Sequence, residues 1–332
     1  MITLEHNALV IPFPEVHRDA RVRVAFQRTL RIPDDGRDYP LPPGLGVFPL
    51  HHVEDYAERL PATWQKRGGV FLPLYQSEAL WLHFGGNGYP IALQIAAGKI
   101  NAVSGEPWQD EPQFEPQGYV VAPDQPWLDG FCVEHGRIRQ FVAAPLGQGI
   151  SVEEQLTGKA EFGGLQIKAC PLKAKLWERL QHQQPMFEGL VYEAADATFS
   201  APQSAAMGLG MGGSMKQEIY ADSFAPDNWE TAVTARCFVH LINSIAYAEV
   251  TGHLPPHRPY EAADYTKAGL PWFDYYSDQA ALQGSDRLKG LKTWRDFEQE
   301  SAEQQLHIHP KSVIPLGERP REGRPVSQGE SA

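Results

Sequence analysis

Short apolar segments that alternate with turn residues are the feature that most constrains the fold of this chain. Within one of them, Ile91, Leu93 and Ile95 share a face, as in a half-buried strand. The connections are short, and a parallel pair needs a crossover of about a dozen residues or more. We therefore expect antiparallel pairing. The first such segments span 70–75, 79–84, 91–96 and 100–103.

Two hairpin turns strengthen this interpretation. His135-Gly136 lies between apolar segments 127–134 and 137–143, and both turn residues tolerate positive φ. Ala97-Gly98-Lys99 has the length of a second hairpin connection. If Val133 and Ile138 face inward, the charged side chains of the first hairpin face water. Those charged residues are Glu134, Arg137 and Arg139.

A helix is predicted over residues 228–251. Asp227 and Glu230 resemble an N-terminal cap, and Gly252 followed by Pro255-Pro256 is a C-terminal stop. Apolar residues recur between these signals at spacings of three and four. They are Trp229, Val233, Cys237, Leu241, Ile245 and Ala248.

These elements together predict an α+β fold. An antiparallel sheet of hairpins occupies roughly residues 70–200, and the long helix 228–251 packs on it or forms the core of a smaller unit. We expect a β-rich region over 1–200, an α-rich region over 201–305 and a loosely ordered tail over 306–332. A small-residue loop at 201–213 is either a linker between the first two regions or an internal crossing of one continuous domain.

Composition excludes several classes of protein. The chain has 42% hydrophobic residues, which is enough to build a core, and a net charge of −12, which argues against holding nucleic acid by charge. Its 30 Gly and 28 Pro argue against a plain helix bundle. Three cysteines without CxxC spacing suit a reducing compartment. Since the chain also lacks a secretory pattern and an 18-residue apolar run, we expect a cytoplasmic protein away from membranes.

A glycine-rich segment, residues 208–216, is the first candidate site. Backbone amides around Gly210, Gly212 and Gly213, with Lys216 beyond them, have the composition of a phosphate cradle. The spacing matches neither the P-loop nor the dinucleotide fingerprint. We therefore favour a turned loop in which backbone packs against backbone, with phosphate binding as the alternative.

An aromatic segment, residues 271–276, is the second candidate. Adjacent large rings cannot all point into one core, so part of the segment is expected to line a surface or a concavity. The alternative is that the rings seal a mixed core beneath an irregular loop. Aromatic faces beside a carboxylate suit sugars, cations or peptides. The residues concerned are Trp272, Phe273, Asp274, Tyr275 and Tyr276.

Histidine and cysteine chemistry gives weaker candidates. His307 and His309 have the two-residue spacing that puts both imidazoles on one side of a strand, yet a zinc site needs at least three protein ligands. No nucleophile motif surrounds the cysteines. Cys132 and Cys237 are expected to be buried.

Two functions are consistent with these features. We favour a non-catalytic binding or assembly protein that uses the aromatic and glycine-rich surface, needs no cofactor and takes a protein or small-molecule partner. The alternative is a metal-assisted hydrolase with His307 and His309 as ligands.

Overall fold

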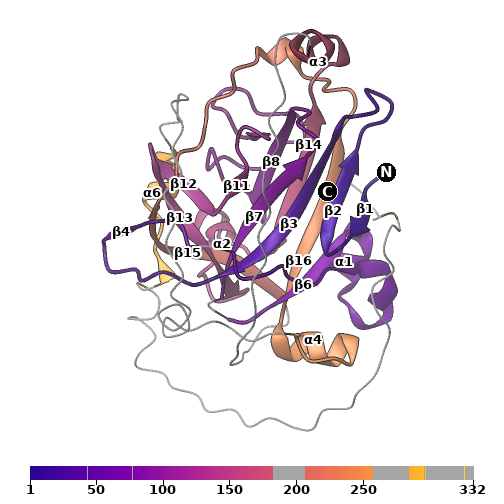
Figure 1. Cartoon of the computed structure of the whole chain (residues 1–332). Coiled ribbons are helices and arrows are strands. Elements are labelled where there is room, and N and C mark those ends of the chain that lie inside the picture. Colours follow the sequence, from indigo (N-terminus) through magenta and orange to yellow (C-terminus); the bar gives the residue numbers. More distant parts are fainter. Residues whose placement is uncertain are drawn as a thin grey trace.

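One large sheet organises the part of the chain that the structure, a computed structural model, describes (Figure 1). The described residues are 1–42, 44–76, 78–181, 206–256, 284–294, 296 and 325. Among them 16 strands join in one sheet, in which all pairings but β4–β15 and β6–β16 are antiparallel. The expectation of an antiparallel, sheet-rich fold is confirmed, and the sheet takes strands from both sides of residue 200.

The first half of the sheet has the order β1-β2-β3-β7-β13-β15. Its longest pairing before β13 runs between β3 and β7, from Val22 opposite Gly86 to Thr29 opposite Ala79. The strands are β1 (Thr3–Glu5), β2 (Ala8–Pro12), β3 (Arg21–Thr29), β7 (Ala79–Gly86), β13 (Arg137–Pro145) and β15 (Ala206–Lys216). Attached to them are β4 (Asp38–Tyr39), β11 (Trp127–Leu128) and β12 (Gly130–Glu134).

The second half has the order β16-β14-β8-β10. In the sheet order it joins the first half through two residue pairs between β15 and β16. The strands are β16 (Ala235–Asn243), β14 (Leu165–Pro171), β8 (Ile91–Ala97) and β10 (Val120–Ala122). Attached to them are β5 (His51–His52), β6 (Val70–Leu74) and β9 (Ile100–Asn101).

The hydrophobic core lies between the two halves, because buried side chains from both belong to one cluster. Burial of this apolar surface is the main stabilising contribution to such a fold. Members from the first half include Val24, Phe26, Leu80 and Leu82. Members from the second half include Leu93, Ile95, Ile167 and Val239.

Short helices cover the outer face of β6 and β16. Phe71 and Ile242 point away from the main core and form a second cluster with Trp64 and Tyr247. None of the helices in the described ranges is long and apolar enough to cross a membrane. The helices are η1 (Val53–Arg59), α1 (Ala62–Arg67), α2 (Val152–Thr157), α3 (Ala174–Gln181), η2 (Pro226–Asn228), α4 (Ser244–Thr251) and α6 (Asp286–Lys289).

Both predicted hairpins are confirmed. β12 and β13 meet at His135-Gly136, where Glu134 pairs with Arg137 and Gly136 has φ +68°. β8 and β9 meet at Gly98, which has φ +59°. Glycine suits both positions because a positive φ strains residues that have a Cβ atom.

The long helix predicted over 228–251 is wrong. Residues 235–243 form strand β16, and the helix α4 begins only at Ser244, where the Asn243 side chain accepts a hydrogen bond from the Ala246 amide. Residues four apart, such as Cys237 and Leu241, share a face in a strand as well as in a helix. Both faces of β16 carry buried apolar residues, so the pattern of this segment alone fits a strand and a helix equally. The predicted stop at Gly252 is confirmed.

The predicted loop at 201–213 is also wrong over residues 206–213. They belong to strand β15, whose residues 207–215 are all buried. Met207, Leu209 and Met211 face the main core, while Gly208 and Gly210 form the opposite face. Met207, Leu209 and Met211 do alternate with glycines as a strand requires, but glycine is typical of turns and is depleted in strands, so the composition of the segment favours a loop. Residues 201–205 lie outside the described ranges.

Candidate functional site

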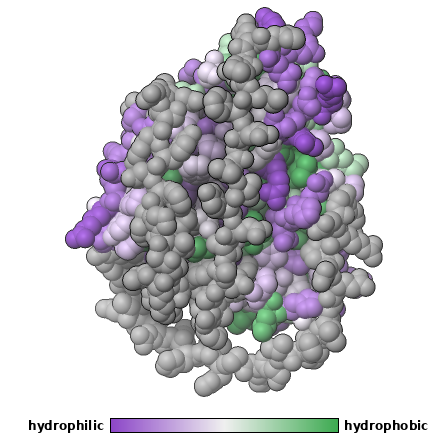
Figure 2. Space-filling view, viewed as in Figure 1, coloured by the Kyte–Doolittle hydropathy of each residue, from purple (hydrophilic) through white to green (hydrophobic). Residues whose placement is uncertain are grey.

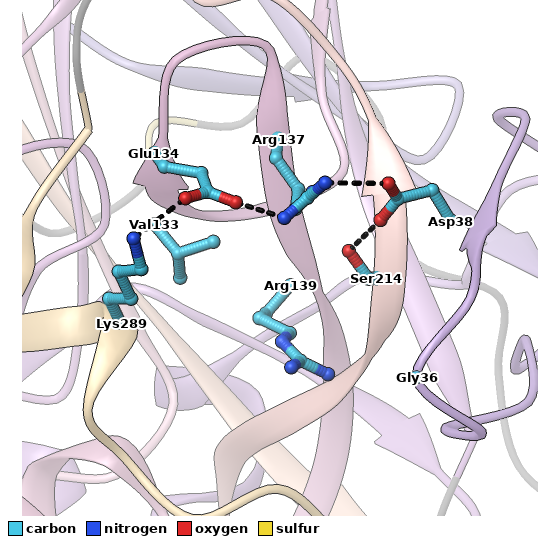
Figure 3. Close-up of a pocket in the computed structure, with 8 residues that line it drawn as sticks. All are labelled: Gly36, Asp38, Val133, Glu134, Arg137, Arg139, Ser214 and Lys289. Carbon is cyan, nitrogen blue, oxygen red and sulfur yellow. Dashed lines mark hydrogen bonds and ion pairs between the residues drawn. The ribbon is translucent and has the colours of Figure 1, made fainter.

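A charged pocket of about 260 Å³ lies where four parts of the chain converge (Figure 3). The β12–β13 hairpin, β15, β4 with the segment before it, and α6 all contribute lining residues. A pocket of this size suits a small polar molecule or a single charged group better than a drug-sized ligand. The lining residues are Gly36, Asp38, Val133, Glu134, Arg137, Arg139, Ser214 and Lys289.

Arg137 holds the centre of the pocket by bridging two carboxylates (Figure 3). It donates to Glu134 through one terminal nitrogen, and its Nη2 lies 2.8 Å from Asp38 Oδ2. The hydroxyl of Ser214 donates to Asp38 Oδ1 over 2.5 Å. These charge-assisted hydrogen bonds link side chains from four strands, β4, β12, β13 and β15, around the pocket.

Lys289 and Arg139 complete the charge distribution. The Lys289 ammonium lies 2.8 Å from Glu134 Oε2, and Arg139 Nη1 lies 2.8 Å from Asp34 Oδ1. Asp34 does not itself line the pocket, so the lining carries three cations and two carboxylates. An ammonium can donate three hydrogen bonds and a guanidinium five. The pocket therefore has more donor capacity than these ion pairs use.

The ion pairs also keep the pocket groups charged. The hydrogen bond from Lys289, with the charge of Arg137, lowers the pKa of Glu134. The same hydrogen bond raises the pKa of Lys289. Both pKa values move away from neutrality, so neither group is suited to exchange a proton at neutral pH. Chemically, this arrangement can form ion pairs and hydrogen bonds with a charged group.

Strand register explains why these residues meet. Arg137 and Arg139 are two apart in β13 and so share one face. Ser214 is opposite Arg139 in the antiparallel β13–β15 pair and beside Asp38 in the parallel β4–β15 pair. Glu134 reaches Arg137 across the two-residue turn. The predicted hairpin thus supplies Glu134, Arg137 and Arg139, while the pairing of β15 with β13 and β4 brings Ser214 and Asp38 to them.

The glycine-rich candidate lies next to this pocket, but its glycines are covered. A Cβ atom on Gly210 would lie 3.2 Å from the Ile150 carbonyl oxygen, and one on Gly213 would lie 2.3 Å from the Pro33 carbonyl oxygen. Gly212 packs against Val142 and Gln140 in the same way. Lys216 is exposed at the end of β15, opposite Arg137. The glycines therefore serve close packing.

The other sequence candidates are not placed by the structure. The aromatic residues Trp272, Phe273, Asp274, Tyr275 and Tyr276 lie outside the described residues, as do His307 and His309. Within the described part of the chain, no group of three or more His, Cys, Asp or Glu could hold a metal ion. The aromatic surface and the metal site therefore stay predictions.

Three of the described histidines, His51, His52 and His240, and all three thiols are buried away from the pocket. Burial lowers the pKa of His240 to about 3, and its Nε2 lies 3.0 Å from the Gly68 carbonyl oxygen. Burial likewise lowers the pKa of His51 to about 4. All three cysteines are free and buried, and burial raises the pKa of each thiol to about 12. Thiols in this state are poor nucleophiles.

Sequence reasoning missed the pocket, because Arg137 and Arg139 look like ordinary solvated charges on a hairpin. Their two-residue spacing next to Glu134 was the available signal, but their partners Asp38, Ser214 and Lys289 are far away in sequence. Comparison with known protein families, with curated proteins and with solved structures finds no match to this chain.

Proposed function

We propose that this protein is a non-catalytic binding protein and that the charged pocket is its binding site. The single observation that supports this most is the convergence of Arg137, Arg139 and Lys289 on one pocket, where Lys289 has three donors and pairs with Glu134. Asp34 balances the charge of Arg139, so the site offers spare hydrogen-bond donors rather than a net positive charge. A small ligand that bears a carboxylate or phosphate can accept hydrogen bonds from these donors.

Arg139 and Lys289 would orient such a ligand. The Arg139 guanidinium extends beneath the row formed by Glu134, Arg137 and Asp38 (Figure 3). A ligand anion between Arg139 and Lys289 would therefore contact fixed donors on two sides. Because the existing ion pairs already hold these side chains in place, little conformational entropy is lost on binding.

The aromatic segment 271–276 and the metal-assisted hydrolase with His307 and His309 stay predictions. The glycine-rich stretch enters the proposal only through its exposed end, since Ser214 lines the pocket and Lys216 lies opposite Arg137. We therefore retain the binding function expected from the sequence, but we assign it to the charged pocket instead of the aromatic and glycine-rich surface.

Calorimetric titration with citrate, succinate and inorganic phosphate tests the proposal. In low-salt buffer we expect at least one of them to bind one-to-one to the wild-type protein. Arg139→Gln and Lys289→Gln should each weaken that binding about tenfold or more, since a charge-assisted hydrogen bond contributes roughly 1.5–3 kcal/mol. Lys289→Gln is needed because Arg139→Gln also removes the ion pair with Asp34.

Arg18→Gln is the matched control, because Arg18 is a strongly exposed cation outside the pocket. It should bind the same ligand as tightly as the wild type. Absence of binding for all three anions, or equal weakening in the control, would contradict the proposal.

A further inference from the structure

A second group of cations, which we call the basic surface, surrounds the outer face of β14 and β16. Its members come from α1, the β8–β9 turn, the segment after α2 and the two strands. They are Arg67, Lys99, Lys159, Lys168 and Arg236. Such a cluster is notable in a chain whose net charge is −12, because most of its surroundings repel anions.

Two phenylalanine rings underlie the basic surface. Phe162 lies 3.7 Å from the Arg67 guanidinium carbon and 4.3 Å from Lys99 Nζ, measured to the ring centroid. Phe238 lies 4.7 Å from the guanidinium carbon of Arg236. Cation–π contacts of this kind fix the positions of long, otherwise mobile side chains. The cations are therefore partly ordered before any partner arrives, which lowers the entropic cost of binding.

The rings are themselves held by further stacking. Phe238 stacks on His240 with centroids 6.1 Å apart, and His240 stacks on Trp64 at 4.4 Å. Phe162 stacks on Phe238 at 6.4 Å. The basic surface thus rests on a continuous row of buried rings rather than on a mobile loop.

Carboxylates of the chain itself engage this surface without neutralising it. Glu161 lies 3.3 Å from Lys99 and 3.9 Å from Lys159, and Asp110 lies 3.1 Å from Arg236. The buried carboxylate of Glu153 accepts backbone hydrogen bonds from residues 162 and 163 beneath them. These three carboxylates face five cations, so a positive excess remains.

We propose that the basic surface is a docking site for an acidic segment of a partner protein. The carboxylates of that segment would take the places in which Glu161 and Asp110 now contact the cations. Lys99 and Lys159 are the accessible members, with 39% and 69% of their side chains exposed. Partner carboxylates can reach both without disturbing the rings below.

An acidic peptide fits better than a nucleic acid. Recognition of single strands depends on bases that stack on free aromatic faces. Phe162 is 8% exposed and already contacts Arg67 and Lys99, so its ring is not available for stacking. The surface can attract negative charge, but the described rings offer no platform for bases.

Fluorescence anisotropy with the full-length protein and a fluorescein-labelled decaglutamate peptide tests the proposal. At low ionic strength the wild-type protein should bind the peptide, and 0.2 M salt should weaken binding through screening. The double substitution Lys99→Glu with Lys159→Glu should weaken it about tenfold or more. The double substitution Arg18→Glu with Lys175→Glu changes the same charge at exposed positions elsewhere and should have less than about a twofold effect.

Three results would overturn the proposal. The first is no binding of decaglutamate to the wild-type protein, and the second is an equal loss in both double variants. The third is tighter binding of a labelled decathymidylate that depends on Lys99 and Lys159, which would assign the surface to nucleic acid. Circular dichroism and the melting temperature of each variant establish that the fold is intact.

Discussion

Two arginine–carboxylate sites of this protein use the same chemistry in opposite surroundings. In the buried site, Arg28 donates through Nε and Nη2 to Glu78 Oε1, and the two side chains are 1% and 3% exposed. In the pocket, Arg137 pairs with Glu134 and Asp38, and 44% of its side chain is exposed. Both sites thus use charge-assisted hydrogen bonds, and they differ in their exposure to solvent.

The surroundings decide what each site can do. Glu78 also accepts the Tyr75 amide, and Arg28 lies 5.9 Å from the Phe48 ring, so the buried pair is enclosed by fixed neighbours. Burial raises the pKa of Glu78 although Arg28 opposes the shift. The pocket pairs, in contrast, are partly exposed, so water and solutes can reach their charges. Access to solvent thus decides how strongly each charge pair is screened and how costly it is to break.

Breaking the buried pair should have the largest effect. Glu78→Gln leaves the Arg28 guanidinium buried without its anion, and arginine cannot lose its proton. We expect the free energy of unfolding to fall by about 3–5 kcal/mol. Urea denaturation followed by tryptophan fluorescence measures the change.

The double variant Arg28→Met with Glu78→Met provides the control for that prediction. Replacing both charges with apolar side chains of similar length should cost less than Glu78→Gln alone. If Glu78→Gln lowers the free energy of unfolding no more than a surface substitution does, burial does not make this pair more important for stability than the pocket pairs.

Asp129 extends the comparison to a buried carboxyl paired with an amide instead of a cation. Its Oδ2 accepts from Gln217 Nε2 over 3.0 Å, and burial raises the pKa of Asp129 to about 8. The unfolded chain has a value of about 3.9, so it releases this proton while the native state keeps it. The unfolding free energy of the wild type should therefore decline as the pH rises from about 4 to about 8.

Asp129→Asn cannot ionise and should escape that decline. Between pH 5 and pH 7, its unfolding free energy should rise relative to wild type by at least about 1.4 kcal/mol, the equivalent of one pKa unit. Chemical denaturation of both proteins at several pH values measures this difference. If the difference in unfolding free energy between Asp129→Asn and the wild type stays constant with pH, Asp129 is already ionised in the native state.

The smallest stability effect is expected at the pocket. Arg137→Gln leaves Glu134 in contact with Lys289 and leaves Asp38 bonded to Ser214, with water close to both. We expect a loss of about 1 kcal/mol or less. Salt should diminish it, since exposed ion pairs are screened. A loss of unfolding free energy as large as that of Glu78→Gln would show that solvent exposure does not distinguish the two sites.

Local signals predicted much of the fold. Gly136 turns the β12–β13 hairpin as expected, and Gly252 ends α4 at the predicted stop. The failures fall where the local pattern was ambiguous. The four-residue spacing of Cys237 and Leu241 fits two structures, and the glycines of β15 hide one face of a strand. Only the neighbours of those segments, β14 and β13, decide their conformation.

The candidate site was less predictable for a related reason. Arg137 and Glu134 are close in sequence, but Asp38 comes from a strand about 100 residues earlier and Lys289 from a helix about 150 residues later. Convergence over such distances depends on the pairing of β4, β13 and β15. A single sequence shows which residues are charged, but it does not show which of them converge in the folded protein.

The position of β16 has a consequence for how the chain is made. This strand pairs with β6, β14 and β15, yet it is the last of the named strands to leave the ribosome. Until it emerges, the strands that it joins keep open edges, which invite pairing with other chains. Completion of the sheet must therefore wait for about three quarters of the translation of this chain.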